Sequence, residues 1–347
     1  MVPDGEWLRQ GAFKYPESTE RLRWSRTREI LERIKPGPHE DADYIAMLAH
    51  QAAAIELCIA QWPRFTEHNS DLLTRIIIGT TVAPRSQGST SLVAGCSVIE
   101  MSAGMIDLLY QSAKAIVLSW KRTDPKGKAA VGFSDRREDT EEVLDGNPYS
   151  TDLLCDTLAT WLYEGRSRAS YSEAPPDEYH PPLKLILSGA ERFVLAHEYG
   201  HAVMDLLAPQ DVPATNWERE LRADDFATMV VAQSSDQLDL LPPAIALRGA
   251  VVAMRAHDVL DAALQIACHG HETGSTSSST HPSFETRLAA LERFFVEASD
   301  DAKMAREQLP DLRVPAVTLG QLWDRIAPLL RAQHRAGRRL HAIWKAA

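Results

Sequence analysis

The sequence predicts an α+β fold that is mostly helical and carries one small β-sheet. Apolar residues recur at helical spacing over most of the chain, which favours amphipathic helices. One run, residues 75–82, is rich in β-branched side chains, as buried strands are. The 347 residues are 44% apolar and 24% charged, with 18 Gly and 20 Pro, which is ordinary for a globular protein and excludes a collagenous or disordered chain.

The individual elements follow from the same periodicity, taken in chain order. Strands are expected at residues 75–82 and 96–101, where β-branched residues gather. Two polar stretches, 123–147 and 172–182, are expected to be exposed, because they contain too few apolar residues to pack. Helices are expected over residues 20–34, 43–62, 102–120, 153–163, 183–295 with a polar break at 270–280, and 319–344.

The charge balance argues against two classes of partner. With 37 Lys+Arg against 48 Asp+Glu the net charge is -11, so neither nucleic acid nor an anionic membrane surface is expected to bind. Charged residues interrupt every long apolar stretch, so no membrane span is expected. The first ten residues lack the segments of a signal peptide, and the four cysteines lack CxxC spacing and are expected to be reduced thiols. We therefore expect a soluble, cytoplasmic protein.

One helical segment contains the motif His197-Glu198-x-x-His201. Two histidines four residues apart on a helix lie about 40° from each other around its axis, so both imidazoles can bind one metal ion. Glu198 lies beside that metal, where it can take a proton from a water molecule. The motif therefore predicts a zinc site with Glu198 as the general base. A capping box formed by Ser188 and Glu191 is expected to start the helix.

A second helical segment offers the third ligand that a catalytic zinc needs. Thr215 and Glu218 form a capping box at its start. Glu220 and Asp224 are four residues apart and share one face of this helix. Glu220 can bind the metal, and Asp224 can accept the free N–H of a ligating histidine, which fixes the tautomer of the ring. Considered alone, the segment would be a charged, solvent-exposed face, but its place after an HExxH helix favours the metal site.

The motif HExxH followed by E-x-x-A-D resembles that of the gluzincin zinc metallopeptidases. Residues 220–224 look like the third-ligand motif of the CAAX-protease and heat-shock-protease branch, and residues 280–287 are similar to its T-H-P-x-x-x-x-R signature. Residues 192–198 look like the corresponding helix of ImmA/IrrE-type peptidases, which cleave regulatory proteins in bacteria. The first branch is often membrane-embedded, whereas this chain has no expected membrane span.

The resemblance implies a zincin-like catalytic domain over residues 71–299, with a helical N-terminal region at 1–70 and a helical C-terminal extension at 300–347. It also implies the roles of five side chains. The implied zinc ligands are His197, His201 and Glu220, the implied general base is Glu198, and the implied orienting carboxylate is Asp224.

The segment 280–287 adds two candidates whose roles stay open. His281 or Arg287 could stabilise the oxyanion of a tetrahedral intermediate, or could instead fix their helix against the helix of Glu220. The Ser/Thr/Gly tract at 270–280 is expected to act as a mobile gate that brings His281 toward the zinc.

The expected strand at 96–101 is a candidate for substrate binding. In gluzincins an edge strand ahead of the zinc helix pairs with the substrate backbone, and such pairing gives affinity through main-chain hydrogen bonds. An internal core strand is the alternative, and the edge is slightly preferred. The residues expected to form this edge are Ser97, Val98, Ile99, Glu100 and Met101.

Together these features predict a zinc-dependent metalloendopeptidase that hydrolyses peptide bonds of a selected protein or peptide substrate. The helical additions at both ends are expected to restrict access to the site. Two alternatives stay open: a zinc hydrolase that does not cleave peptides, and a zinc-binding regulatory protein without turnover. An edge strand along a groove would favour the peptidase, whereas a plugged position beside the zinc would favour the binding protein. No feature of the sequence indicates an oligomeric state.

Overall fold

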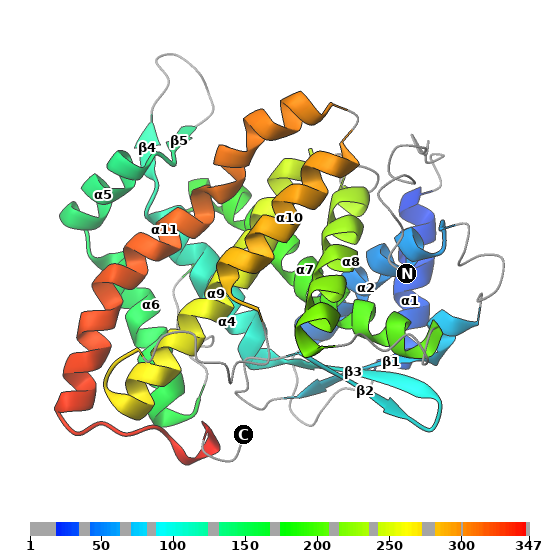
Figure 1. Ribbon diagram of the computed structural model, residues 1–347, viewed down its shortest axis with the longest axis horizontal. Coiled ribbons are helices and arrows are strands. Elements are labelled where there is room, and N and C mark those ends of the chain that lie inside the picture. Colours follow the sequence, from blue (N-terminus) through cyan, green and yellow to red (C-terminus); the bar gives the residue numbers. More distant parts are fainter. Residues whose placement is uncertain are drawn as a thin grey trace.

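The computed structural model describes residues 19–34, 42–62, 71–81, 88–123, 132–166, 174–207, 215–235, 242–272, 282–299 and 301–344. This part of the chain is mostly helical and contains a three-stranded and a two-stranded sheet, so the expected α+β fold class is confirmed. Figure 1 shows the three-stranded sheet at one end of the molecule, beneath the helices. Within the described ranges, no helix combines the length and the apolar character needed to cross a membrane.

The elements fall close to most of the expected ranges, and both expected strands correspond to observed ones, β1 and β3. The α-helices are α1 (Thr19–Arg33), α2 (Ala42–Ile59), α4 (Ala103–Leu118), α5 (Arg137–Gly146), α6 (Tyr149–Ala159), α7 (His180–Leu207), α8 (Asn216–Ser234), α9 (Pro243–His269), α10 (Phe284–Ala298) and α11 (Ala302–Arg335). The strands are β1 (Ile76–Thr81), β2 (Ser89–Val93), β3 (Cys96–Ser102), β4 (Lys121–Thr123) and β5 (Gly132–Ser134).

Strand β3 lies at the centre of the three-stranded sheet, whose order is β1-β3-β2. It pairs in parallel with β1 from Ser97 onward and antiparallel with β2, where Ile99 faces Thr90. The expectation that residues 97–101 form a sheet edge is therefore wrong, because both sides of β3 are already hydrogen-bonded to neighbouring strands. The side chains of Ser97, Ile99 and Met101 are fully buried, as in a core strand.

Helix α7 occupies the middle of the helical layer and packs against α2, α4, α8 and α9, as well as against β2 and β3 (Figure 1). Its inward side chains Phe193, Leu195 and Ala196 are at most 2% exposed. Buried side chains from Ile30 to Leu330 form one continuous apolar core. Helices from all three regions distinguished in the sequence thus share this core, and the boundaries after residues 70 and 299 stay a prediction.

The start of α7 differs from the expected one. The helix begins at His180, so Ser188 lies inside it and does not cap its N-terminus. Pro181 and Pro182 occupy the first turn, where proline is tolerated because its missing N–H needs no helical partner. The Ser188 hydroxyl instead accepts a hydrogen bond from Gln51 of α2, at 3.2 Å. At the start of α8 the Thr215 hydroxyl accepts the backbone N–H of Glu218, which confirms Thr215 as the cap and is one of the two hydrogen bonds of the expected capping box.

Two further stretches are more helical than expected. Residues 123–147, expected to be an exposed excursion, contain β5 and α5, in which Thr140 and Leu144 are buried one turn apart. Helix α11 begins at Ala302 instead of residue 319 and continues through three prolines. Prolines usually end helices, which is why the sequence alone favours a later start.

Candidate metal centre and active site

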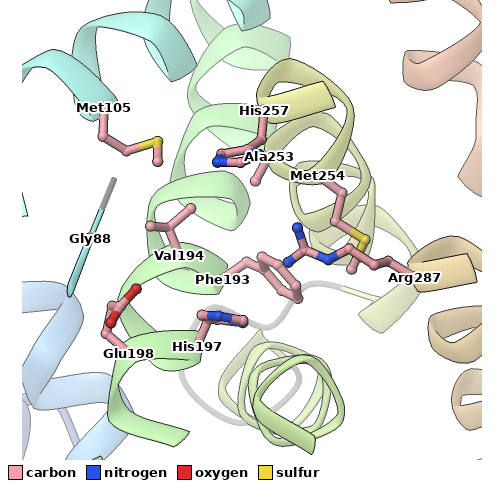
Figure 2. Close-up of a pocket in the computed structure, with 10 residues that line it drawn as sticks. All are labelled: Gly88, Met105, Phe193, Val194, His197, Glu198, Ala253, Met254, His257 and Arg287. Carbon is pink, nitrogen blue, oxygen red and sulfur yellow. The ribbon is translucent and has the colours of Figure 1, made fainter. Parts of the chain in front are cut away.

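Three polar side chains of α7 are buried and project from neighbouring positions of the helix. His197, Glu198 and His201 are 7%, 6% and 7% exposed. The two imidazole rings are nearly perpendicular, with centroids 4.7 Å apart and Nε2 atoms 3.1 Å apart. Figure 2 shows that Glu198 projects to the side of the helix that faces Gly88. The spacing of the motif thus brings two ring nitrogens to one point and sets a carboxylate beside them.

Helix α8 places a second carboxylate at the same point. Glu220 Oε2 lies 3.2 Å from His197 Nε2, and Glu220 Oε1 lies 3.5 Å from His201 Nε2. The ligand atoms of the three residues all lie within 4.8 Å of one another. Zinc bonds of about 2.0–2.1 Å imply ligand atoms about 3.3 Å apart in a tetrahedral site. The three side chains therefore fit around one metal ion and can hold it.

Gly200 allows α8 to come this close to α7. A Cβ atom at this position would lie 3.1 Å from the Cα of Ala223 and 3.3 Å from the Cβ of Phe226, tighter than most side-chain contacts. Because glycine has no side chain, the two helix backbones meet within one turn of Glu220. The glycine of the sequence His-Glu-Tyr-Gly-His thus helps to bring the third candidate ligand to the two histidines.

Asp224 fixes the orientation of His197. Its Oδ1 lies 2.9 Å from His197 Nδ1, so Asp224 can accept the proton of that nitrogen and leave Nε2 for the metal site. Arg287 of α10 holds Asp224 in turn, donating from Nε to Oδ2 at 2.7 Å and from Nη2 to Oδ1 at 2.6 Å. Asp224 is 2% exposed and Arg287 is 7% exposed. A buried chain of contacts therefore leads from α10 through Asp224 to His197.

The charges around the two histidines favour a cation. Burial tends to raise the pKa of Asp224, but the Arg287 guanidinium and His197 outweigh it and lower this pKa to about 2. Burial tends to lower the pKa of His197, but hydrogen bonds to Asp224 and Glu220 outweigh it and raise this pKa to about 9. Among the described residues, the carboxylates of Glu198, Glu220 and Asp224 thus lie around these histidines, and the Arg287 guanidinium is bonded to Asp224. A pKa of about 9 means that His197 holds a proton at neutral pH, and a bound metal ion would supply positive charge in place of that proton.

A cavity adjoins His197 and Glu198, as Figure 2 shows. It encloses about 440 Å³ of space, part of it open to solvent. Its wall is mostly apolar, with a few polar groups, which is typical of sites that take a ligand or a substrate side chain. The residues that line it are Gly88, Met105, Phe193, Val194, His197, Glu198, Ala253, Met254, His257 and Arg287.

Sequence reasoning missed strand β2, which lies against Glu198. The Thr90 hydroxyl donates to Glu198 Oε2 at 2.7 Å, and a Cβ atom on Gly88 would lie only 2.8 Å from Glu198 Cγ. The sequence of β2 gives little signal, because every residue of the strand except Thr90 is exposed. The turn that follows it places Ala94 at φ 50°, a backbone conformation that glycine or asparagine adopts more readily.

Sequence reasoning also missed the hydrogen-bonded group that holds the side of α7 from which Tyr199 projects. Tyr199 is fully buried, and its hydroxyl donates to Glu56 Oε1 of α2 at 2.8 Å. Arg26 and Arg33 of α1 donate to the same carboxylate, at 2.7 and 2.6 Å. The tyrosine of the motif therefore packs in the core and also connects the metal-site helix to the N-terminal helices. The signal available in the sequence was Glu56, a glutamate within a mostly apolar helical segment.

Glu191, six residues before His197 on α7, is 8% exposed, and burial raises its pKa to about 7. The folded protein thus holds this proton over a pH range in which the unfolded chain releases it. The contribution of Glu191 to the stability is therefore greatest at or below pH 4.5 and falls as the pH rises toward 7, by about 3 kcal/mol in all. We expect Glu191→Gln to unfold at a higher urea concentration than the wild type at pH 8, and at nearly the same concentration at pH 5.

The control for this prediction is Glu138→Gln, which changes an exposed glutamate of α5. This variant should differ little from the wild type at either pH. A Glu191→Gln variant whose stability relative to the wild type is the same at pH 5 and pH 8 would show that Glu191 ionises alike in the folded and unfolded chains.

The remaining expected site residues have different outcomes. His281 and most of the expected gate at 270–280 lie outside the described residues. Arg287 lines the cavity, but two of its nitrogens are bonded to Asp224. Residues 97–101 belong to the central strand, and the cavity lining found among the described residues includes none of them.

Comparison with known proteins gives the class of the protein. The family model of Peptidase U49 matches residues 119–306, more than half of the chain, and the match includes α7, α8 and α10. The match identifies a peptidase, an enzyme whose substrate is a protein or peptide. In particular, the chain belongs to the Peptidase U49 family. No curated protein matches the chain, and no solved structure does.

Proposed function

We propose that this peptidase is a zinc metalloendopeptidase in which His197, His201 and Glu220 hold the metal and Glu198 is the general base. The observation that carries the proposal is the convergence of three side chains, whose nitrogen and oxygen atoms lie 3.1 to 3.5 Å apart, beside another carboxylate that lines a cavity. Two imidazoles and one carboxylate are a typical ligand set of catalytic zinc, which keeps a further position open. The arrangement also supports the resemblance to gluzincins.

The proposed chemistry divides between the metal and Glu198. A zinc ion held here would polarise the carbonyl of the scissile bond and make a water molecule more acidic. Glu198 directly follows His197 and lines the same cavity, so its carboxylate can take a proton from the attacking water. The same carboxylate can then give that proton to the leaving amine. Its burial keeps competing bulk water away during both transfers.

Asp224 and Arg287 are proposed as positioning residues. Asp224 holds His197 through its Nδ1 atom, and Arg287 holds Asp224 with two hydrogen bonds. An Arg287 side chain engaged in this way serves the orientation of the ligand and leaves the oxyanion to another group. His281 keeps its role as a candidate for that group, from outside the described residues.

We propose that the substrate backbone pairs with β2. One edge of β2 is bonded to β3, and the other edge has no strand partner among the described residues. A peptide lying along that edge would pass the carboxylate that Thr90 contacts, and main-chain pairing of this kind binds extended segments of a protein. None of the four cysteines forms a disulfide, which is consistent with the proposed cytoplasmic location.

Metal analysis tests the proposal directly. The purified wild type is expected to contain about one zinc ion per chain, and Glu220→Ala is expected to lose most of it, because two imidazoles alone make an incomplete site. Inductively coupled plasma mass spectrometry measures the content, and circular dichroism checks that the variant is folded.

The matched control is Glu218→Ala, on the same helix. The Glu218 carboxylate accepts a hydrogen bond from Arg222, so this variant should keep its zinc. A Glu220→Ala protein with a full complement of zinc would show that the third ligand is another residue.

A further inference from the structure

We infer that Gly88, which directly precedes β2, and Thr90 of β2 form a seat for the Glu198 carboxylate, in which Thr90 orients the side chain and Gly88 makes room for it. The inference rests on the proposed role of Glu198. It adds two positioning residues, one in the sheet and one directly before it, and both lie N-terminal to the residues matched by the family model.

Thr90 makes the contact that orients the carboxylate. Its hydroxyl lies 2.7 Å from Glu198 Oε2 and 3.1 Å from the backbone oxygen of Glu198. A hydroxyl has one proton, and the shorter contact to a charged acceptor is the stronger hydrogen bond. Within the described part of the chain, Thr90 is the only side chain that donates to this carboxylate. One oxygen is thereby fixed, and Oε1 is left to accept a proton from water.

Gly88 makes the room that this orientation needs. A Cβ atom at position 88 would lie 2.8 Å from both Cγ and Oε1 of Glu198. Gly88 and Thr90 are two residues apart, so they face the same side of an extended chain. Figure 2 shows Gly88 on the side of α7 from which Glu198 projects. Any side chain at position 88 would press on the oxygen that we propose to be the proton acceptor.

Contacts within the sheet support the seat in addition to its contacts with α7. β2 pairs with β3 along its whole length, with Thr90 opposite the fully buried Ile99. Arg75 donates twice to the carbonyl of Gly95 in the turn between the two strands, at 2.8 and 2.6 Å. A side chain that projects from such a supported strand keeps its position, as a group that orients a catalytic carboxylate must.

The substitution Thr90→Val tests the orienting contact, because it keeps the shape of the side chain and removes the donor. Cleavage of a single quenched fluorescent peptide, selected from a library with the wild type, is the activity readout. We expect kcat to fall by about tenfold to a hundredfold, with KM within about twofold of the wild type. Zinc content and melting temperature should stay nearly unchanged. Thr90→Ser restores the hydroxyl and should recover most of kcat.

The substitution Gly88→Ala tests the room for the carboxylate. It should lower kcat at least as strongly as Thr90→Val, while the zinc content is retained. Gly146→Ala is the matched control, because a Cβ atom at position 146 would meet nothing within 4 Å. Crystal structures of the wild type and Thr90→Val give a readout that does not depend on activity. In the wild type Glu198 Oε2 should lie within hydrogen-bond distance of Thr90, and in the variant the carboxylate should have rotated away.

The outcomes separate the inference from the proposed function. If Glu198→Gln is inactive while Thr90→Val cleaves at the rate of the wild type, the seat is wrong and the proposed function stands. An unmoved carboxylate in the Thr90→Val crystal structure also overturns the inference. If Glu198→Gln itself remains active, the proposed function is wrong, and the inference that rests on it is wrong as well.

Discussion

Glu198→Gln is expected to retain its zinc and to lose peptide cleavage by a factor of about 10² to 10⁴, because an amide cannot accept the proton of the attacking water. The Glu198 carboxylate is not among the three converging ligand atoms, so the metal content should not change. The Thr90 hydroxyl can still donate to the glutamine oxygen, so folding should be preserved. Cleavage of a quenched peptide library, measured beside zinc content and melting temperature, gives the result.

The control for this variant is Glu218→Gln, which makes the same chemical change on α8, where the carboxylate is paired with Arg222. It should cleave the library like the wild type. A Glu198→Gln enzyme that cleaves within a few-fold of the wild type would contradict the proposed mechanism, whatever its metal content.

Asp224→Ala is expected to have two large effects that arise from different contacts. Loss of the carboxylate that holds His197 should weaken zinc binding by about tenfold to a hundredfold. Loss of the partner of Arg287 leaves a buried guanidinium unpaired and should lower the free energy of unfolding by about 3–5 kcal/mol. Zinc affinity is measured by competition with a chelator, and stability by urea denaturation.

A second substitution separates these two effects. The double variant Asp224→Ala, Arg287→Met removes the unpaired charge, so it should regain most of the lost stability and none of the lost zinc affinity. Equal recovery of both quantities would show that Asp224 affects the metal only by keeping α8 and α10 together.

The parts of the site that lie on helices could be read from the sequence, because they depend on local spacing. His197 and His201 are one turn apart, and so are Glu220 and Asp224, and a helix places each pair on one face whatever surrounds it. The meeting of the two helices could not be read in this way. It depends on a close approach at Gly200, which only the packed structure reveals.

The parts of the site that come from distant segments could not be derived from spacing. Thr90 and Glu198 are separated by 108 positions, and Glu56 and Tyr199 by 143. The choice of β3 as the edge strand failed for the same reason. Its apolar, alternating sequence indicates a strand, but only the pairing with the weakly patterned β2 shows that it is the central one.

The residues that precede the family match contribute to the candidate site from two sides. The Peptidase U49 model begins at residue 119, after β2 and after the helix that carries Glu56. β2 contacts Glu198, and Glu56 of α2 binds Tyr199 of the same helix. The matched segment therefore carries the candidate metal ligands, while the preceding residues support the helix from which two of them project.

X-ray diffraction from crystals of the purified wild type, measured on both sides of the zinc absorption edge, tests the central claim most directly. The difference between the two data sets locates zinc without reference to any assumed ligand. We expect one strong peak bonded to Nε2 of His197, Nε2 of His201 and a carboxylate oxygen of Glu220, with an open position toward Glu198. A peak bound by other residues, or no peak among these three side chains in a protein that cleaves peptides, would contradict the account.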